Sequence, residues 1–230
     1  RIALALAADP AAAVPDDFVA AFRTLLNDAA LDPAFRAQAL ALPGEAYLLE
    51  RMSPADPGAL RGALIRLMRA LGSTLAADWL RVFDAMQVPG EYRYHPGDAG
   101  RRALANLALR YLAAVGDTDG LQRAEARFAA ATNMTERFGA LAALVQSASP
   151  ARAAALQAFH DRYRDDALVL DKWFALQAGA WLWDDAGESA LARVRVLVSD
   201  PSFSLSNPNK VYALLGTFFR ANPGEFHAAD

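Results

Sequence analysis

The sequence predicts an all-α protein, built as a superhelical stack of antiparallel helix pairs. Alanine and leucine, both strong helix formers, dominate the 230 residues. Apolar residues recur at helical spacing, and no convincing alternating run of β-branched residues is present. A short polar residue followed by proline recurs along the chain, as expected at helix starts. No strict period and no linker-like stretch divide the sequence, so we predict a single helical domain over residues 1–230.

Four segments show the apolar stripe of an amphipathic helix most clearly. In each segment the apolar residues lie three or four positions apart, on the face that a helix turns toward a core. The stretch 194–198 comes nearest to a strand, but it continues a helical pattern and is interpreted as a helix end. The four stripes are Phe18, Phe22, Leu25, Leu26, Ala29; Leu60, Leu64, Leu67, Met68, Leu71; Leu75, Trp79, Val82, Phe83, Met86; and Val211, Leu214, Leu215, Phe218.

Helix boundaries are predicted from capping chemistry. A short polar side chain can accept hydrogen bonds from free amides of the first turn, and proline suits the first helical position because its missing N–H costs nothing there. Asn133 with Glu136 gives a start similar to a capping box. The segments 118–120 and 183–187 are interpreted as loops within the domain. The polar-proline pairs are Asp32-Pro33, Ser53-Pro54, Asp56-Pro57, Ser149-Pro150, Asn207-Pro208 and Asn222-Pro223.

Composition excludes several classes of partner. The net charge is −3, from 23 basic and 26 acidic residues, with no basic stripe of the kind that nucleic-acid binding requires. No stretch reaches the roughly 18 to 20 apolar residues of a membrane crossing. We therefore expect neither a nucleic acid nor a membrane as partner. Cysteine is absent, which excludes disulfides and thiolate metal sites and fits a reducing compartment, so we expect a cytoplasmic location.

Catalytic motifs are missing from the sequence. His95, His160 and His227 are the only histidines, and none has a histidine four residues away, so the helical H-E-x-x-H zinc signature is absent. Neither a Gly-rich phosphate loop nor a G-x-S-x-G elbow is present. The sequence therefore predicts no catalytic residue and no metal ligand in this chain.

Other charged and aromatic pairs have ordinary structural interpretations. Paired aspartates are interpreted as helix starts, where negative charge complements the helix dipole, and paired arginines as solvated faces. The tryptophan-rich segments fit core packing, and an exposed interdomain surface remains the alternative. These features are Asp16-Asp17, Asp165-Asp166 and Asp184-Asp185; Arg101-Arg102 and Arg193 with Arg195; and Lys172-Trp173-Phe174 and Trp181-Leu182-Trp183.

Three segments resemble a known family in order and spacing. Residues 132–141 (TNMTERFGAL) resemble the N-N-M-T-x-x-x-x-A-L stretch of bacterial aminopeptidases N, and residues 168–178 (LVLDKWFALQA) resemble their L-V-M-D-K-W-F-x-L-Q-A. Residues 206–210 (SNPNK) match S-N-P-N-R, followed by the N-P and F-H pairs at 222–223 and 226–227. Weaker similarity at 42–45 and 91–93 extends the resemblance over nearly the whole chain.

The resemblance implies the C-terminal helical domain of a gluzincin zinc aminopeptidase. Family membership would place the H-E-x-x-H motif, the glutamate ligand and the G-x-M-E-N motif in an earlier domain, so we expect no cofactor in this fragment and zinc in the parent's catalytic domain. The expected partners are the catalytic and other domains of the same chain, and peptide substrates on their way to the active site. Family members continue beyond F-H-x-x-D, so we expect a fragment truncated at both ends, which self-associates through exposed apolar surface.

One turn is the candidate for contact with substrate. The helix start at Asn207 presents free backbone amides, a side-chain amide at Asn209 and the cation of Lys210, and such a start can receive a carboxylate or a polar peptide segment. The alternative is a structural cap with an exposed lysine. Lys210 and Tyr212 stand where relatives commonly carry arginine, which weakens any inherited anion contact. The candidate substrate-channel residues are therefore Asn207, Asn209, Lys210 and Tyr212.

Two functions follow as hypotheses. The first is a noncatalytic domain of a zinc aminopeptidase that covers the active site and restricts substrate access. The second is a free-standing helical array that binds a protein or peptide on its concave face. An open reading frame that continues upstream into H-E-x-x-H would favour the first, and a start codon just before Arg1 would favour the second.

Overall fold

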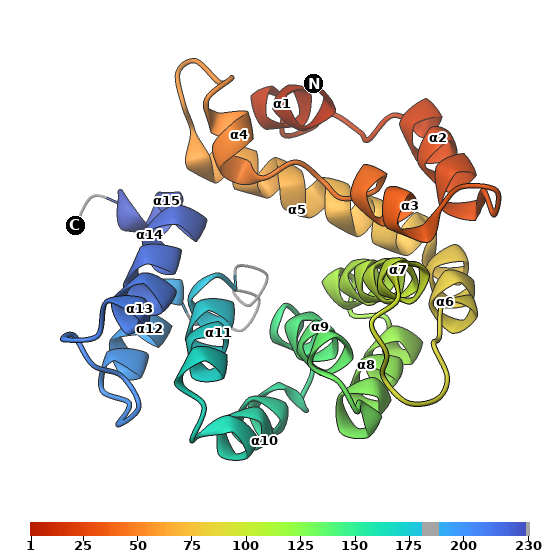
Figure 1. Cartoon of the computed structure of the whole chain (residues 1–230). Helices are drawn as coiled ribbons and strands as arrows, with labels where there is room; N and C mark the ends of the chain where they lie inside the picture. The colour runs from red at the N-terminus through yellow and green to blue at the C-terminus, as the bar shows by residue number, and fades with distance from the viewer. Residues whose placement is uncertain (181–188, 229–230) are drawn as a thin grey trace. The chain divides into compact units, whose positions relative to one another are not determined.

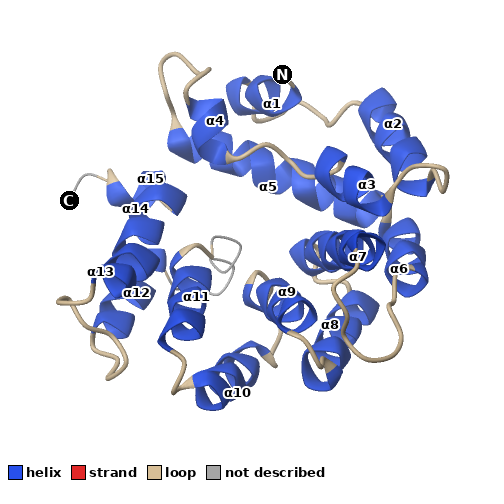
Figure 2. Ribbon diagram, in the orientation of Figure 1, coloured by secondary structure: helices blue, strands red, loops and turns tan. Residues whose placement is uncertain are grey.

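The computed structural model describes residues 1–180 and 189–228. All regular secondary structure in these residues is helical (Figure 2), so the predicted all-α class is confirmed. Across the same residues, no helix is both long and apolar enough to cross a membrane. The predicted features Trp181-Leu182-Trp183 and Asp184-Asp185 lie outside the described residues.

The chain divides into two compact units, Arg1–Leu144 and Val145–Asp230, so the single domain over residues 1–230 stays a prediction. In the first unit, α7 packs against α3, α5, α6 and α8, while α1 and α4 pack against α5 (Figure 1). The helices from the N-terminus to the unit boundary are α1 (Ile2–Ala8), α2 (Asp16–Asn27), α3 (Pro33–Ala39), α4 (Glu45–Leu49), α5 (Pro57–Thr74), α6 (Ala76–Ala85), α7 (Pro96–Ala114), α8 (Thr118–Ala130) and α9 (Met134–Val145).

An aromatic cluster forms the centre of the first unit. The rings of Trp79 and Tyr111 stack with centroids 4.4 Å apart, and Phe22 meets both rings edge-on. The Tyr111 hydroxyl donates a hydrogen bond of 2.8 Å to the Leu40 carbonyl, and burial raises the pKa of Tyr111. Helices α5 and α7 approach closely at Gly72, where an added Cβ would lie 2.5 Å from the Tyr111 carbonyl oxygen. This close contact requires glycine at position 72.

The second unit is centred on α11. Helix α11 (Ala167–Ala178) packs against α10 (Arg152–Tyr163), α12 (Ala190–Val198), the π-helix η2 (Tyr212–Gly216) and α14 (Thr217–Ala221). Trp173 and Phe174 are buried, and the Trp173 indole donates a hydrogen bond of 3.0 Å to the Leu156 carbonyl. The core-packing interpretation is therefore confirmed for these two aromatic residues.

Short helices complete the second unit. α13 (Pro208–Val211) runs directly into η2 and α14, and α15 (Pro223–Phe226) follows. The Glu225 carboxylate accepts hydrogen bonds from the Ala190 and Leu191 amides, at 3.1 and 2.9 Å, and Ser189 Oγ accepts one from Ala192. Glu225, 35 residues farther along the chain than Ala190, therefore caps the start of α12.

Several of the predicted helix starts are confirmed by hydrogen bonds. Side-chain oxygens accept from first-turn amides at Asp32 for α3, Asp56 for α5, Asp166 for α11 and Asn207 for α13. Asn133 Oδ1 accepts from the Glu136 amide at 3.0 Å, which is one of the two hydrogen bonds of a capping box. The stretch 194–198 ends α12, as predicted.

Other boundary predictions are wrong. Residues 118–120 were predicted to form a loop but form the first turn of α8, because Asp117 caps the Gly120 amide at 2.7 Å. Pro54 starts no helix, since α5 begins only at Pro57. The predicted start at Asn222-Pro223 is confirmed as a boundary, since α15 begins at Pro223, but Asn222 does not cap it, because its buried amide donates instead to the Ala178 carbonyl at 2.7 Å.

Candidate functional site

The predicted turn at Asn207 forms as expected from its sequence. Asn207 Oδ1 accepts a hydrogen bond of 3.0 Å from the Asn209 amide, and Pro208 occupies the first helical position of α13. The side chains of Asn207 and Asn209 are exposed, and Tyr212 is 65% exposed. Three of the four candidate residues are therefore accessible to a ligand.

Lys210, the fourth candidate residue, points into the protein. It is only 5% exposed, and its ammonium lies 3.0 Å from Asp171 Oδ1 and donates to the Ala167 carbonyl at 3.1 Å. The ammonium also lies 5.3 Å from the centre of the Phe174 ring, within range of a cation–π contact. The expectation of an exposed lysine in the structural alternative is thus wrong, and the charge of Lys210 is engaged in tying α13 to α11.

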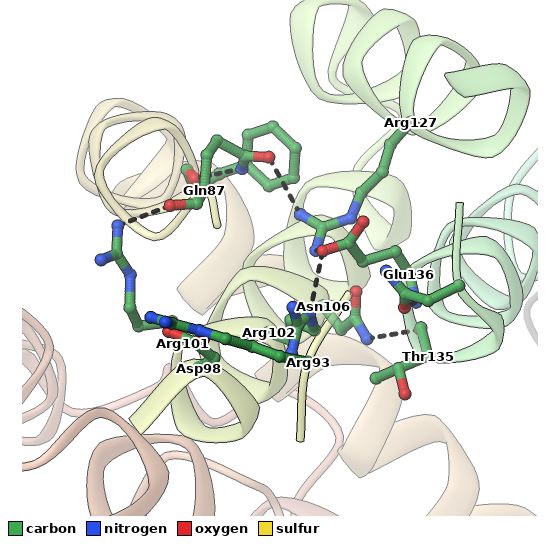
Figure 3. Close-up of polar contacts among 11 residues, drawn as sticks. Gln87, Arg93, Asp98, Arg101, Arg102, Asn106, Arg127, Thr135 and Glu136 are labelled. Atoms are coloured by element: carbon green, nitrogen blue, oxygen red, sulfur yellow. Dashed lines mark hydrogen bonds and ion pairs between the residues drawn. The ribbon is translucent and has the colours of Figure 1, made fainter. Parts of the chain in front are cut away.

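A second polar cluster, which the sequence did not predict, joins α7, α8 and α9 (Figure 3). Arg102 Nε lies 3.1 Å and Arg127 Nη2 lies 3.5 Å from the same Glu136 oxygen. Arg127 also donates a hydrogen bond of 3.4 Å to Gln87 Oε1. Arg102 is only 3% exposed, so the prediction that Arg101 and Arg102 form a solvated face is wrong for Arg102.

The charges of this cluster do not balance, because two guanidinium groups share one carboxylate. Burial lowers the pKa of Arg127; the attraction of Glu136 opposes this shift and the nearby charge of Arg102 adds to it. The Tyr92 ring stacks over the Arg102 guanidinium, with its centroid 4.9 Å away. This arrangement joins three helices and brings no nucleophile next to a base, so we assign the cluster a structural role.

The prediction that Arg193 and Arg195 lie on a solvated face is wrong for Arg193. It is buried, and its guanidinium donates to the carbonyl oxygens of Gln177 at 3.3 Å and Ala180 at 2.8 Å. Its neighbour Arg195 is exposed, as expected. Arg193 therefore satisfies carbonyls at the end of α11, while Arg195 lies on the solvated face of α12.

The histidines do not form a zinc site in the part of the chain that the structure describes. No group of three or more metal-ligating side chains occurs there. His95 is exposed at the start of α7 and His227 is exposed after α15, while His160 Nε2 lies 3.2 Å from Ser202 Oγ. The described donors thus do not fit the requirements of a catalytic zinc ion.

Known proteins with similar sequences and folds are aminopeptidases. The chain is 40% identical over 205 residues to aminopeptidase N of Caulobacter vibrioides and 38% identical over 213 residues to that of Escherichia coli. These alignments cover 89% and 91% of this chain but only 23% of each relative. A solved structure of Legionella pneumophila aminopeptidase A in complex with aspartic acid matches with a TM-score of 0.79 and 28% identity, over 95% of this chain and 26% of that chain.

A family model agrees with these relatives along the whole chain. The model, described as a domain of unknown function (DUF3458_C) with ARM repeats, matches residues 1–230. ARM repeats are stacks of helices, as in the superhelical array expected from the sequence. The chain therefore belongs to the DUF3458_C family of helical-repeat domains and is a C-terminal domain of the aminopeptidase N type.

Proposed function

We propose that this chain is the noncatalytic helical domain of a zinc-dependent aminopeptidase that removes N-terminal residues from peptides. It covers the active site of the parent enzyme and restricts the route by which peptides reach it. Closing such a site against bulk water strengthens the electrostatic interactions within it. Zinc, the catalytic residues and the principal partner surfaces belong to other domains of the same chain, and the parent acts in the cytoplasm.

The observation that carries this proposal is the partial coverage of the relatives. Two proteins named aminopeptidase N align with nearly all of this chain, yet the chain spans only 23% of their length. A segment of that size fits one domain of a larger enzyme. The absence of a recognised nucleophile–base pair from the sequence supports an accessory role rather than a catalytic one.

The exposed residues of the Asn207–Tyr212 turn supply the proposed contact with substrate. Asn207 and Asn209 offer amide groups, and Tyr212 offers an exposed ring with a polar hydroxyl. Such groups can hold an extended peptide through hydrogen bonds and ring contacts. Lys210 holds the turn against α11 through its ion pair with Asp171.

The proposal is tested with the chain and with the full-length parent protein. The chain alone should not hydrolyse an alanyl chromogenic substrate with added zinc, whereas the parent should. In the parent, Tyr212→Ala should raise KM for a tetrapeptide about threefold to tenfold and leave the small chromogenic substrate unchanged, because only the longer substrate reaches the turn.

Tyr94→Ala is the matched control, because Tyr94 is an exposed tyrosine of the first unit and should affect neither substrate. Zinc-dependent turnover by the chain itself, abolished by a point substitution within it, would overturn the accessory role. Equal effects of Tyr212→Ala on the short and long substrates would refute the proposed contact between the turn and the peptide.

A further inference from the structure

The helix that begins at Pro208 has one exposed face and one buried face. It runs without interruption through α13, η2 and α14, from Pro208 to Ala221. Asn209, Tyr212, Gly216 and Arg220 follow the spacing that places residues along one face of a helix. The opposite face carries the buried residues Lys210, Leu214 and Phe218.

Gly216 lies in the middle of this helix without a packing reason for glycine. Its φ and ψ of −61° and −33° are ordinary helical values that any residue adopts. Apart from the backbone of the helix itself, the atoms nearest to an added Cβ would be those of the Arg220 guanidinium, at 3.6 and 3.7 Å, and of the Tyr212 ring, at 3.6 Å. These are normal contacts with flexible side chains, so alanine would fit and would favour the helix more than glycine does. Gly72 in the first unit differs, since a Cβ there would collide with backbone.

The same turn is also a π-helix. Tyr212–Gly216 form η2, and the Thr217 hydroxyl bonds to the Tyr212 carbonyl at 3.4 Å. Short π-helical turns inside α-helices are rare and occur frequently at functional sites. Two features that disfavour an ordinary helix, the glycine and the π-turn, therefore coincide between Tyr212 and Arg220.

Arg220 supplies an available cation at this turn. It is exposed, and it makes no hydrogen bond or ion pair with any other residue in 1–180 or 189–228. Lys210, which the sequence had offered as the cation, is buried against Asp171. The positive charge that a ligand can reach on this helix is therefore that of Arg220.

We propose that Tyr212, Gly216 and Arg220 form a binding strip for the C-terminal carboxylate of a short peptide. The planar Arg220 guanidinium receives the carboxylate through two parallel N–H···O hydrogen bonds. The missing side chain at Gly216 leaves room for the peptide main chain, and the Tyr212 ring packs against the last side chain of the peptide. The choice of a peptide as ligand rests on the proposed function, and the carboxylate preference rests on Arg220.

The experiment is a calorimetric titration of the 230-residue chain with the tripeptide Ala-Ala-Phe and with its C-terminal amide. The free acid should bind at least about tenfold more tightly than the amide, because the amide cannot accept the charge-assisted pair. Arg220→Gln should abolish this difference. Arg195→Gln is the matched control, since Arg195 is an exposed arginine of α12 in the same unit, and it should preserve the difference.

Gly216→Ala separates binding from folding. It should raise the thermal midpoint of unfolding, because alanine favours a helix, and weaken binding of both peptides by filling the space between Tyr212 and Arg220. Circular dichroism of each variant checks that the helices are retained.

Several results would overturn the strip. They are equal affinity for acid and amide, no binding of the acid by the folded chain, equal effects of Arg220→Gln and Arg195→Gln, or unchanged binding by Gly216→Ala. None of these results bears on whether the chain is an accessory domain, because that proposal fails only on the turnover assays.

Discussion

Replacing Glu136 by glutamine removes the carboxylate that Arg102 and Arg127 share, at nearly unchanged side-chain volume. The helix start at Asn133 should survive, because Asn133 bonds the backbone amide of residue 136 and not its side chain. The variant therefore isolates the loss of one negative charge between two buried guanidinium groups.

The expected cost follows from burial. The side chains of Arg102 and Arg127 are 4% and 5% exposed and that of Glu136 is 16% exposed, so solvent screens the cluster poorly. Breaking a buried pair by removing one partner typically costs about 3 to 5 kcal/mol, because the remaining charge stays buried. The Arg93–Asp98 pair has a comparable nitrogen–oxygen distance of 3.1 Å, but Arg93 is 76% exposed, so solvent screens that pair. The expected cost of breaking the two sets of ion pairs therefore differs because of burial and not because of the nitrogen–oxygen distance.

Urea denaturation followed by circular dichroism measures this cost as a change in the free energy of unfolding. Glu91→Gln is the control, because Glu91 is exposed in the same unit and should change stability by less than about 0.5 kcal/mol. Adding Arg127→Met to Glu136→Gln should recover part of the loss, since it removes one uncompensated cation. A cost of Glu136→Gln below about 1 kcal/mol would refute the structural role of the cluster.

Two further predictions concern a glycine contact and an acidic side chain of the first unit. Gly72→Ala should destabilise the chain by about 1 to 3 kcal/mol in the same assay, because its Cβ would clash with the Tyr111 carbonyl. Gly62→Ala, in the same helix, has open space around the added Cβ and should stabilise the chain by up to about 1 kcal/mol. Equal effects of the two substitutions would contradict the close approach of α5 and α7. Burial alone would raise the pKa of Asp78, but hydrogen bonds, first that from Arg81, outweigh burial and lower it. The folded state thus favours the charged carboxylate of Asp78. The contribution of this carboxylate to the free energy of unfolding is therefore present above its ordinary pKa and is lost as the pH falls through its lowered pKa in the folded state. The stability difference between wild type and Asp78→Asn, about 1 kcal/mol at neutral pH, should therefore disappear in acid, and a constant difference would argue against this shift.

The sequence predicted the helices well where local chemistry decides. The apolar stripe at 60–71 is buried in full, and caps such as Asp32 and Asp56 act on amides two or three residues away. These interactions depend only on neighbours in the chain. The loop prediction at 118–120 failed because a glycine there suggested a break, whereas packing accounts for it: a Cβ at Gly120 would lie 2.5 Å from Leu112 Cβ.

Side-chain direction was harder to predict, because it depends on which helices meet. Arg102 stands three and seven residues before the buried Ala105 and Leu109, so the helical stripe itself places it on the buried face. That spacing could have identified Arg102, but not its partner Glu136, which lies 34 residues away on another helix. Lys210 likewise precedes the buried Leu214 by one helical turn, while its partner Asp171 comes from α11.

The cap on α12 limits how the second unit can be shortened. The Glu225 carboxylate accepts hydrogen bonds from the free amides at the start of that helix. A version of the chain ending at Gly224 would therefore leave the Ala190 and Leu191 amides without these acceptors and let the first turn unwind. Any shorter version of the second unit should therefore retain the short helix α15, because it carries the residue that caps α12.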